Sequence, residues 1–266
     1  MRICRVAVDD DLYFGLIEGE AVVLLAGHPF GELAPEGRVL PLADVRLVAP
    51  VMPTKVIAVG RNYVDHAKEL GNEVPVAPMI FLKPSSSIVG PGVPIRLPWQ
   101  SEQVEHEAEL AIIIGRVASE VPEERVREVV LGYTCANDVS ARDWQIKWGG
   151  GQFCQGKSFD TFCPLGPVLV TKDEIPNPNA LRIRTILNGE TLQDWNTDDM
   201  IFDVPAIIAY LSSSKTLVPG TVILTGTPHG VGFARNPPVW LKSGDSVTID
   251  IEKIGALTNP VVNEKV

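Results

Sequence analysis

Three glutamates alternate with other residues just before an apolar run of the sequence. Glu105, Glu107 and Glu109 precede Leu110–Ile114, whose composition favours a strand. Side chains alternate between the two faces of a strand, so the three carboxylates would share one face, about 6.5 to 7 Å apart. That face continues into apolar positions, where a carboxylate without a partner is costly, and no Lys or Arg lies between residues 100 and 114. A divalent cation such as Mg²⁺ or Mn²⁺ would stabilise these oxygens, although an exposed acidic face has the same spacing.

Asp138 is a candidate for a third ligand. It follows the apolar strand candidate Thr134–Asn137 and precedes a polar turn, a location at which functional residues are often displayed. Position alone is a weak indication. His106 would point to the opposite face of the strand from the glutamates, so we expect a core or rim histidine there rather than a ligand.

The elements expected to position these residues are mostly short strands separated by Gly and Pro. In the larger part of the chain the predicted strands are Val56–Val59, Met79–Leu82, Glu107–Ile114, Thr134–Asn137, Val168–Val170, Ile183–Leu187, Val222–Leu224 and Ser246–Ile251. The predicted helices are Tyr63–Leu70, Pro122–Val130 and one that begins near Pro205. Because regular βαβ alternation is missing, we expect a mainly β (α+β) fold with peripheral helices rather than a doubly wound sheet.

The N-terminal part of the sequence has a different pattern. Its predicted strands are Arg2–Val8, Tyr13–Glu18, Ala21–Leu25 and Val45–Val48, which indicate a small meander. A Gly- and Pro-rich stretch, His28–Pro41, precedes the last of them, and Pro50 and Pro53 follow it. We therefore predict a small N-terminal β domain, residues 1–52, and a larger domain, residues 53–266.

Five motifs follow one another along the larger domain. They are GRNYVDH at 60–66, HEAEL at 106–110, ANDVSARDWQ at 136–145, GKSFDTFCPLGP at 156–167 and LTGTPHGVG at 224–232. Together they resemble the fumarylacetoacetate hydrolase (FAH) family, and their order makes the match specific. The resemblance implies an FAH-type mixed β-roll with a small N-terminal domain, usually a homodimer, in which residues 53–266 form the catalytic domain.

By position in the motifs, the resemblance implies that Glu107, Glu109 and Asp138 hold a divalent cation. Mg²⁺ is expected, with Mn²⁺ or Ca²⁺ as alternatives. Glu105 lies outside the ligand motif and is expected to be peripheral. A zinc hydrolase is disfavoured, because none of the four histidines lies in an HxH or HExxH arrangement.

The resemblance also assigns further residues to the site. Lys157 could be an ordinary surface lysine, but the family pattern implies a catalytic group that meets the substrate's carboxylate or developing enolate. Arg142 and Gln145 fall in the family's substrate-contacting stretch, and Gly226 and Thr227 are expected to line the pocket. Their glycine-rich loop lacks the Gly-Lys-Ser/Thr ending of a phosphate-binding loop.

His66 and Glu69 would be neighbours on one face of a helix. A surface His–Glu pair is the ordinary explanation of this spacing. Because the match extends through GRNYVDH, we favour the catalytic dyad that some family members carry on a mobile lid helix. The carboxylate would orient the imidazole and raise its basicity, as a general base near neutral pH requires.

The function implied is that of a divalent-metal-dependent hydrolase that cleaves a C–C bond in an acylpyruvate-type 2,4-dioxo acid. Oxaloacetate decarboxylase, keto–enol tautomerase and 2-hydroxyhepta-2,4-diene-1,7-dioate isomerase are alternatives. The motifs do not separate these reactions, because all of them use an enolate of a 2-oxo acid. A member that serves only as a binding protein would lack the ligands or Lys157, and none of these is missing.

Composition argues against several other classes of protein. A net charge of −10 and a pI of about 4.9 disfavour nucleic acids and anionic membranes as partners. The longest apolar stretch is far shorter than the roughly 20 residues of a membrane span. No secretory signal is visible and the four cysteines include no CxxC pair, so we expect a cytoplasmic protein with reduced thiols. Its expected partners are a small 2-oxo or 2,4-dioxo acid and a second copy of the chain.

Overall fold

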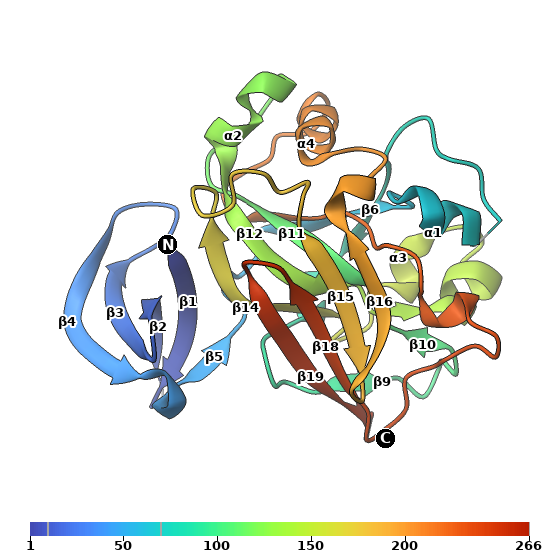
Figure 1. Cartoon of the computed structure of the whole chain (residues 1–266), viewed down its shortest axis with the longest axis horizontal. Helices are drawn as coiled ribbons and strands as arrows, with labels where there is room; N and C mark the ends of the chain where they lie inside the picture. Colours follow the sequence, from blue (N-terminus) through green and yellow to red (C-terminus); the bar gives the residue numbers. More distant parts are fainter. Residues whose placement is uncertain (10, 70, 266) are drawn as a thin grey trace.

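The computed structural model of the chain describes residues 1–9, 11–69 and 71–265. Its fold is mainly β, as predicted, and is built on one long sheet of 12 strands (Figure 1). The path of this sheet is β4 (Leu33–Pro41), β3 (Ala21–Gly27), β2 (Asp11–Glu18), β1 (Arg2–Val8), β14 (Cys163–Thr171), β12 (Val130–Asn137), β11 (Ala108–Ile114), β17 (Thr221–Leu224), β6 (Lys55–Gly60) and β7 (Met79–Lys83). Two short strands are added at its side, β5 (Arg46–Val48) on β1 and β8 (Ile88–Val89) on β14.

A second sheet of five strands covers the middle of the long sheet. Its order is β16 (Glu190–Asn196), β15 (Arg182–Leu187), β18 (Ser246–Ile251), β19 (Gly255–Asn263) and β9 (Ile95–Leu97). β15, β18 and β19 pack against β11, β12 and β14, and the main apolar core lies between the two sheets. A separate pair, β10 (Val104–Glu105) and β13 (Ser140–Ala141), lies beside the site described below.

The N-terminal strands β1 to β4 form an antiparallel meander at one end of the molecule (Figure 1). The Gly- and Pro-rich stretch His28–Pro41 contains the edge strand β4, which the sequence pattern did not indicate. Proline is tolerated there because an edge strand leaves one side of its backbone unpaired. Pairing of Arg2 with Val170 joins the meander to β14. The division into domains at residue 52 remains a proposal.

Strand β11 is buried along its whole length within the long sheet. All seven of its residues are buried, and it pairs with β12 on one side and β17 on the other. Because both faces are covered, Leu110–Ile114 is continuously apolar instead of alternating, and its β-branched side chains suit a strand. Glu109 therefore projects from a rigid element.

Three helices lie close to their predicted positions. α1 is Val64–Glu69, α2 is Val126–Val129 after a 3₁₀ turn at Glu123–Arg125, and α4 is Val204–Ser212. Leu70, the predicted end of the first helix, lies outside the described residues. The second helix ends before its predicted last residue, because Val130 already belongs to β12. Asp203 caps α4 by accepting a hydrogen bond from the N–H of Ala206 at 2.8 Å.

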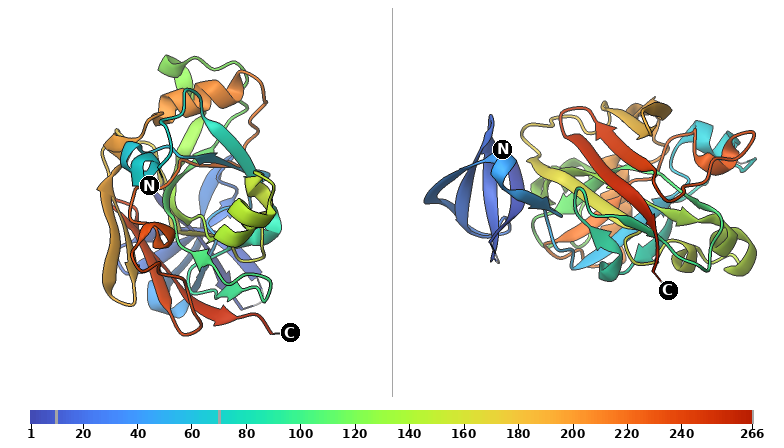
Figure 2. Two further views of the ribbon diagram at one scale, coloured as in Figure 1. Left: turned by 90° about the vertical axis from the view of Figure 1, so that its right-hand side faces the viewer. Right: turned by 90° about the horizontal axis from the view of Figure 1, so that it is seen from below.

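Other helical segments were not predicted. They are a π-helix at Asp143–Trp148, α3 at Phe153–Gly156 and the 3₁₀ turns Leu42–Asp44, Ser85–Ser87, Thr197–Asp199 and Gly232–Ala234. The π-helix, α1 and the turn at Gly232–Ala234 gather at the end of the molecule far from the N-terminal meander (Figure 2). None of the described helices is long and apolar enough to cross a membrane, and all four cysteines are free.

Candidate active site

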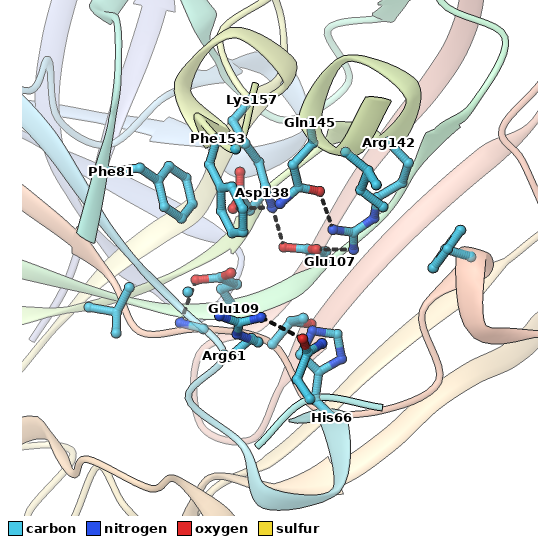
Figure 3. Close-up of a pocket in the computed structure, with 18 residues that line it drawn as sticks. Arg61, His66, Phe81, Glu107, Glu109, Asp138, Arg142, Gln145, Phe153 and Lys157 are labelled. Atoms are coloured by element: carbon cyan, nitrogen blue, oxygen red, sulfur yellow. Dashed lines mark hydrogen bonds and ion pairs between the residues drawn. The ribbon is translucent and has the colours of Figure 1, made fainter. Parts of the chain in front are cut away.

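Antiparallel pairing of β11 with β12 brings the three predicted ligands together (Figure 3). Glu109 pairs with Ala136, so Glu107 and Asp138 lie at the same end of this ladder. The N–H of Asp138 donates to the carbonyl oxygen of Glu107 at 2.9 Å. One carboxylate oxygen from each of the three residues lies within 4.8 Å of the others, and all three residues are buried. The three carboxylates therefore form an acidic triad that could hold a metal ion.

Glu105 occupies a different position from the one expected. The acidic segment is not one continuous strand, since β10 ends at Glu105 and β11 begins at Ala108. The expectation that Glu105 is peripheral is wrong, because its side chain is fully buried and accepts hydrogen bonds from Arg142 and from the N–H of Phe233. The physical reason is the pairing of β10 with β13, which leads directly into Arg142.

Two buried lysines contact the triad. The Nζ of Lys157 lies 2.6 Å from Oε2 of Glu107 and 2.7 Å from Oδ2 of Asp138. The Nζ of Lys83, at the end of β7, lies 2.5 Å from Oδ1 of Asp138. Sequence reasoning found Lys157 but missed Lys83. The available signal was Lys83 itself, which directly follows the apolar strand candidate Met79–Leu82. A lysine that is buried with such a strand requires an acidic partner.

Arg142 is fully engaged with protein groups. It forms ion pairs with Glu105 and Glu107, and its Nη1 donates to Oε1 of Gln145 at 2.5 Å. Burial acts to lower the pKa of Arg142, but the two carboxylates outweigh this effect and raise it. The guanidinium of Arg142 thus holds Glu107 in place, and its predicted contact with a substrate stays a prediction.

The carboxylates of Glu107 and Glu109 have opposite electrostatic environments. Burial acts to raise the pKa of Glu107, but Lys157 and Arg142 lower it to about 2. Burial, Asp138 and Glu107 together raise the pKa of Glu109 well above its ordinary value. Within the described residues Glu109 has no ion pair. A cation beside Glu109 would relieve this repulsion.

The formal charges of the buried cluster sum to one negative charge, which a bound cation would offset. Its members are four carboxylates and three basic groups: Glu105, Glu107, Glu109, Asp138, Lys83, Arg142 and Lys157. Four negative and three positive charges leave one negative charge, which a divalent ion would change to one positive charge. The oxygen-only donor set of the triad therefore fits a hard ion such as Mg²⁺ or Mn²⁺.

Helix α1 carries the predicted His–Glu pair. The Nδ1 of His66 lies 2.7 Å from Oε1 of Glu69, and His66 is almost completely buried. The other carboxylate oxygen of Glu69 accepts a hydrogen bond from the N–H of Gly230 at 2.9 Å. With Nδ1–H donating to this fixed carboxylate, Nε2 of His66 remains as the proton acceptor of the ring.

The loop after β17 connects the triad to this pair. Its first part is fixed by Oγ1 of Thr225, which donates to the carbonyl oxygen of Leu110 at 3.0 Å. The N–H of Gly226 donates to Oε2 of Glu109 at 2.7 Å. Further along, Oγ1 of Thr227 accepts from Nε2 of Gln193 at 2.9 Å. One loop therefore orients Glu109 through the N–H of Gly226 and Glu69 through the N–H of Gly230.

Gly226→Ala is expected to distort this loop. Gly226 has φ of +92°, and a Cβ there would lie 2.7 Å from Cβ of Asn62. We expect a loss of about 1–3 kcal/mol in the free energy of unfolding and weaker Mg²⁺ binding, because the hydrogen bond to Glu109 would shift. Chemical denaturation and a Mg²⁺ titration measure the two effects. Gly37→Ala is a suitable control, since Gly37 also has positive φ but nothing lies near its would-be Cβ; equal Mg²⁺ affinity in Gly226→Ala and wild type would contradict the role given to the loop.

These groups surround a cavity of about 440 Å³, within the range of small-molecule sites. Its lining includes every predicted site residue except Glu69, which contacts the cavity residue His66. Sequence reasoning did not single out the remaining lining residues: Val59, Gly60, Arg61, Asn72, Phe81, Ile146, Gly151, Phe153 and Phe233. Most of these are apolar or come from the π-helix and loops, so the local pattern gave no sign that they share a cavity.

Arg142→Met is expected to destabilise the protein, because it leaves Glu105 and Glu107 buried with fewer partners. The expected loss in the free energy of unfolding is about 3–5 kcal/mol, measured by chemical denaturation. Arg182→Met is a matched control: Arg182 pairs with Asp194 at an exposed position, where solvent screens the ion pair and its loss should change the stability little. Equal effects of the two substitutions would show that the buried network is not held by Arg142.

Comparison with known proteins agrees with the resemblance drawn from the motifs. Residues 55–262 match the family described as Fumarylacetoacetate (FAA) hydrolase C-terminal. The chain therefore belongs to the fumarylacetoacetate hydrolase family. Residues 1–50 match a second family, described as Rv2993c-like, N-terminal.

Three similar proteins have different activities in their names. Oxaloacetate tautomerase fahd2, mitochondrial, of Xenopus laevis is 52% identical over 225 residues, which are 84% of this chain and 70% of that protein. The structure of 5-carboxymethyl-2-hydroxymuconate delta-isomerase from Mycobacterium smegmatis is 46% identical, with a TM-score of 0.89 over 99% of this chain and 100% of that one. Maleylpyruvate hydrolase from Sphingobium sp. SYK-6, solved with manganese (II) ion and pyruvate, is 32% identical, with a TM-score of 0.81 over 100% of both chains. Family membership alone therefore does not select the reaction.

Proposed function

We propose that this protein is a divalent-metal-dependent enzyme that moves a proton in a 2-oxo acid, with enol–keto tautomerisation of oxaloacetate as its reaction. The observation that carries the proposal is that one cavity contains both the carboxylate triad and His66, whose Nδ1 is held by Glu69. A tautomerase requires these two components, a stabiliser of the enolate and a group that exchanges a proton with carbon.

Glu107, Glu109 and Asp138 would hold the ion, which we propose to be Mg²⁺ or Mn²⁺. Members of the family bind a divalent metal, and the maleylpyruvate hydrolase structure contains manganese and pyruvate. When bound, such an ion would polarise the 2-oxo carbonyl and stabilise the negative charge of the enolate.

The residues around the triad would orient the substrate and move its proton. In the enol-to-keto direction, Nε2 of His66 would take the proton of the enol oxygen and deliver a proton to the substrate carbon, and the reverse direction would use the same steps backwards, while Glu69 keeps the ring in the required tautomer. Lys157 would supply a fixed positive charge beside the carboxylate or developing enolate. Phe81, Phe153 and Phe233 would exclude water from the cavity and thereby strengthen these electrostatic interactions.

Hydrolysis of a C–C bond in an acylpyruvate-type acid is the second candidate. The same His66 and Glu69 would then activate water for attack on the distal carbonyl. The size of the cavity favours this candidate, because a four-carbon acid would fill only part of about 440 Å³. Sequence identity favours tautomerisation of oxaloacetate, because the named tautomerase shares 52% identity with this chain, against 38% for a fumarylacetoacetate hydrolase of solved structure and 32% for the maleylpyruvate hydrolase.

The test is a substrate panel with product identification by NMR. Enol-oxaloacetate, fumarylpyruvate and other acylpyruvates are incubated with Mg²⁺, with Mn²⁺ and with a chelator. We expect metal-dependent conversion of the enol to the keto form without pyruvate release. Cleavage of acylpyruvates would select the hydrolase, pyruvate from oxaloacetate would select a decarboxylase, and inertness toward the whole panel would refute the proposal. Light scattering would test the proposed homodimer.

A further inference from the structure

Arg61 is a cavity residue that the chemistry above does not use. It lies between the end of β6 and α1, and its Nη1 donates to Oδ1 of Asn72 at 2.7 Å. Its Nε is buried without a hydrogen-bond partner. Across the described parts of the chain, no carboxylate forms an ion pair with Arg61. A guanidinium with an unsatisfied buried N–H in a ligand cavity indicates a missing acceptor.

The other two long basic side chains of the cavity have their charges paired with carboxylates. Arg142 and Lys157 each contact two carboxylates of the cluster. Arg61 and His66 approach the triad from the side opposite to these two residues (Figure 3). A substrate between the two sides would have a neutralised basic surface at one end and an uncompensated guanidinium at the other.

The backbone of Arg61 supports a functional reason for its position. Its φ is +52°, in the left-handed region that side chains other than glycine rarely adopt. Of the non-glycine residues described with positive φ, Arg61 is the one that lines the cavity. Such conformations persist where the surrounding structure enforces them, often at ligand sites.

We propose that Arg61 binds the distal carboxylate of the substrate and so selects 2-oxo dicarboxylates over 2-oxo monocarboxylates. The inference rests on the proposed function, because it assumes that the 2-oxo acid end lies at the triad. The planar guanidinium matches a carboxylate with two parallel hydrogen bonds, which a lysine does not reproduce. It would also give Nε of Arg61 its acceptor.

The test uses a matched pair of unreactive ligands. N-oxalylglycine has an oxalyl group and a distal carboxylate, and its glycine methyl ester lacks the distal charge while adding only a methyl group. Binding of both is measured by calorimetry with Mg²⁺ in wild type, Arg61→Met and Arg61→Lys. Arg116→Met, which changes the same charge at an exposed position outside the cavity, is the control.

We expect the wild type and Arg116→Met to prefer the dicarboxylate by about 10- to 100-fold. Arg61→Met should reduce this preference to about threefold or less by weakening only the dicarboxylate, and Arg61→Lys should retain part of it. A preference that survives in Arg61→Met, or an equal loss for both ligands, would overturn the proposal. Preference without turnover of enol-oxaloacetate would refute the proposed reaction alone, whereas turnover without preference would refute the role of Arg61 alone. Failure of the wild type to bind either ligand, together with inertness toward enol-oxaloacetate, would refute both.

Discussion

Glu109→Gln is expected to abolish the stabilisation that Mg²⁺ gives the wild-type protein. Glu109 is the triad member without an ion pair among the described residues, and its neighbours raise its pKa. A neutral glutamine should therefore leave the metal-free protein as stable as before, or more stable, while it removes a charged ligand. At about 100 times the dissociation constant, Mg²⁺ should add about 2.7 kcal/mol to the wild type. Thermal unfolding with and without Mg²⁺ measures the difference.

The same substitution should reduce turnover by about 100-fold or more, because the enolate would lose its stabilising charge. Glu102→Gln, at an exposed position of the same segment, is the control and should behave as the wild type. If Glu109→Gln retains the full Mg²⁺-dependent shift in melting temperature, Glu109 is not a ligand. If the metal-free variant unfolds much more easily, the repulsion inferred from its pKa is absent.

His66→Ala has the second large expected effect. Loss of a positioned general base should lower turnover by about 10²- to 10⁴-fold, while Mg²⁺-dependent stabilisation remains because His66 is not a member of the triad. Glu69→Gln should cause a smaller loss, since the ring remains but its orienting carboxylate does not. Steady-state rates with enol-oxaloacetate, together with thermal unfolding, separate the two properties.

His28→Ala is the matched control for this experiment. His28 is exposed and packs between the rings of Phe14 and Phe30 in the N-terminal part. Its replacement should leave the turnover rate unchanged. Full activity of His66→Ala would remove the His–Glu pair from the mechanism, and loss of Mg²⁺ binding in that variant would place His66 at the metal instead.

The triad shows how far sequence reasoning reaches. Strand periodicity proposed Glu105, Glu107 and Glu109 as one acidic face, and the motifs then replaced the first of them with Asp138. The structure brings Glu107, Glu109 and Asp138 together through the register of β11 and β12. Periodicity could not reveal the break at residues 106–107, because that break depends on pairing of β10 with a strand far along the chain.

The partners of the triad were harder to predict for a similar reason. Lys83 and Asp138 are 55 residues apart, and Arg142 and Glu105 are 37 apart, so no local pattern joins them. The absence of basic residues near the glutamates in sequence suggested unpaired charges, yet the fold supplies three cations from other elements. The sequence did not single out Arg61, because the reason to assign it a role appears only in the folded protein: its Nε has no hydrogen-bond partner and no described carboxylate pairs with it.

The buried strands were easier to predict from the sequence than the edge strand and the irregular helices were. Apolar β-prone runs located most of the buried strands, because burial itself requires those residues, but they missed β16 and β19 of the second sheet. β4 and the π-helix at Asp143–Trp148 did not follow from composition. The edge strand tolerates Pro and Gly, and the π-helix depends on tertiary contacts such as Asp143 with Ser101, whose Oγ donates to it at 2.6 Å.

Anomalous diffraction from crystals grown with Mn²⁺ and oxalate would show whether the carboxylate triad holds a divalent ion. We expect one strong manganese peak within coordination distance of Glu107, Glu109 and Asp138. Oxalate should complete its coordination inside the cavity, on the side that faces His66. A peak at any other set of residues, or a triad that stays without manganese while oxalate binds elsewhere, would contradict this expectation.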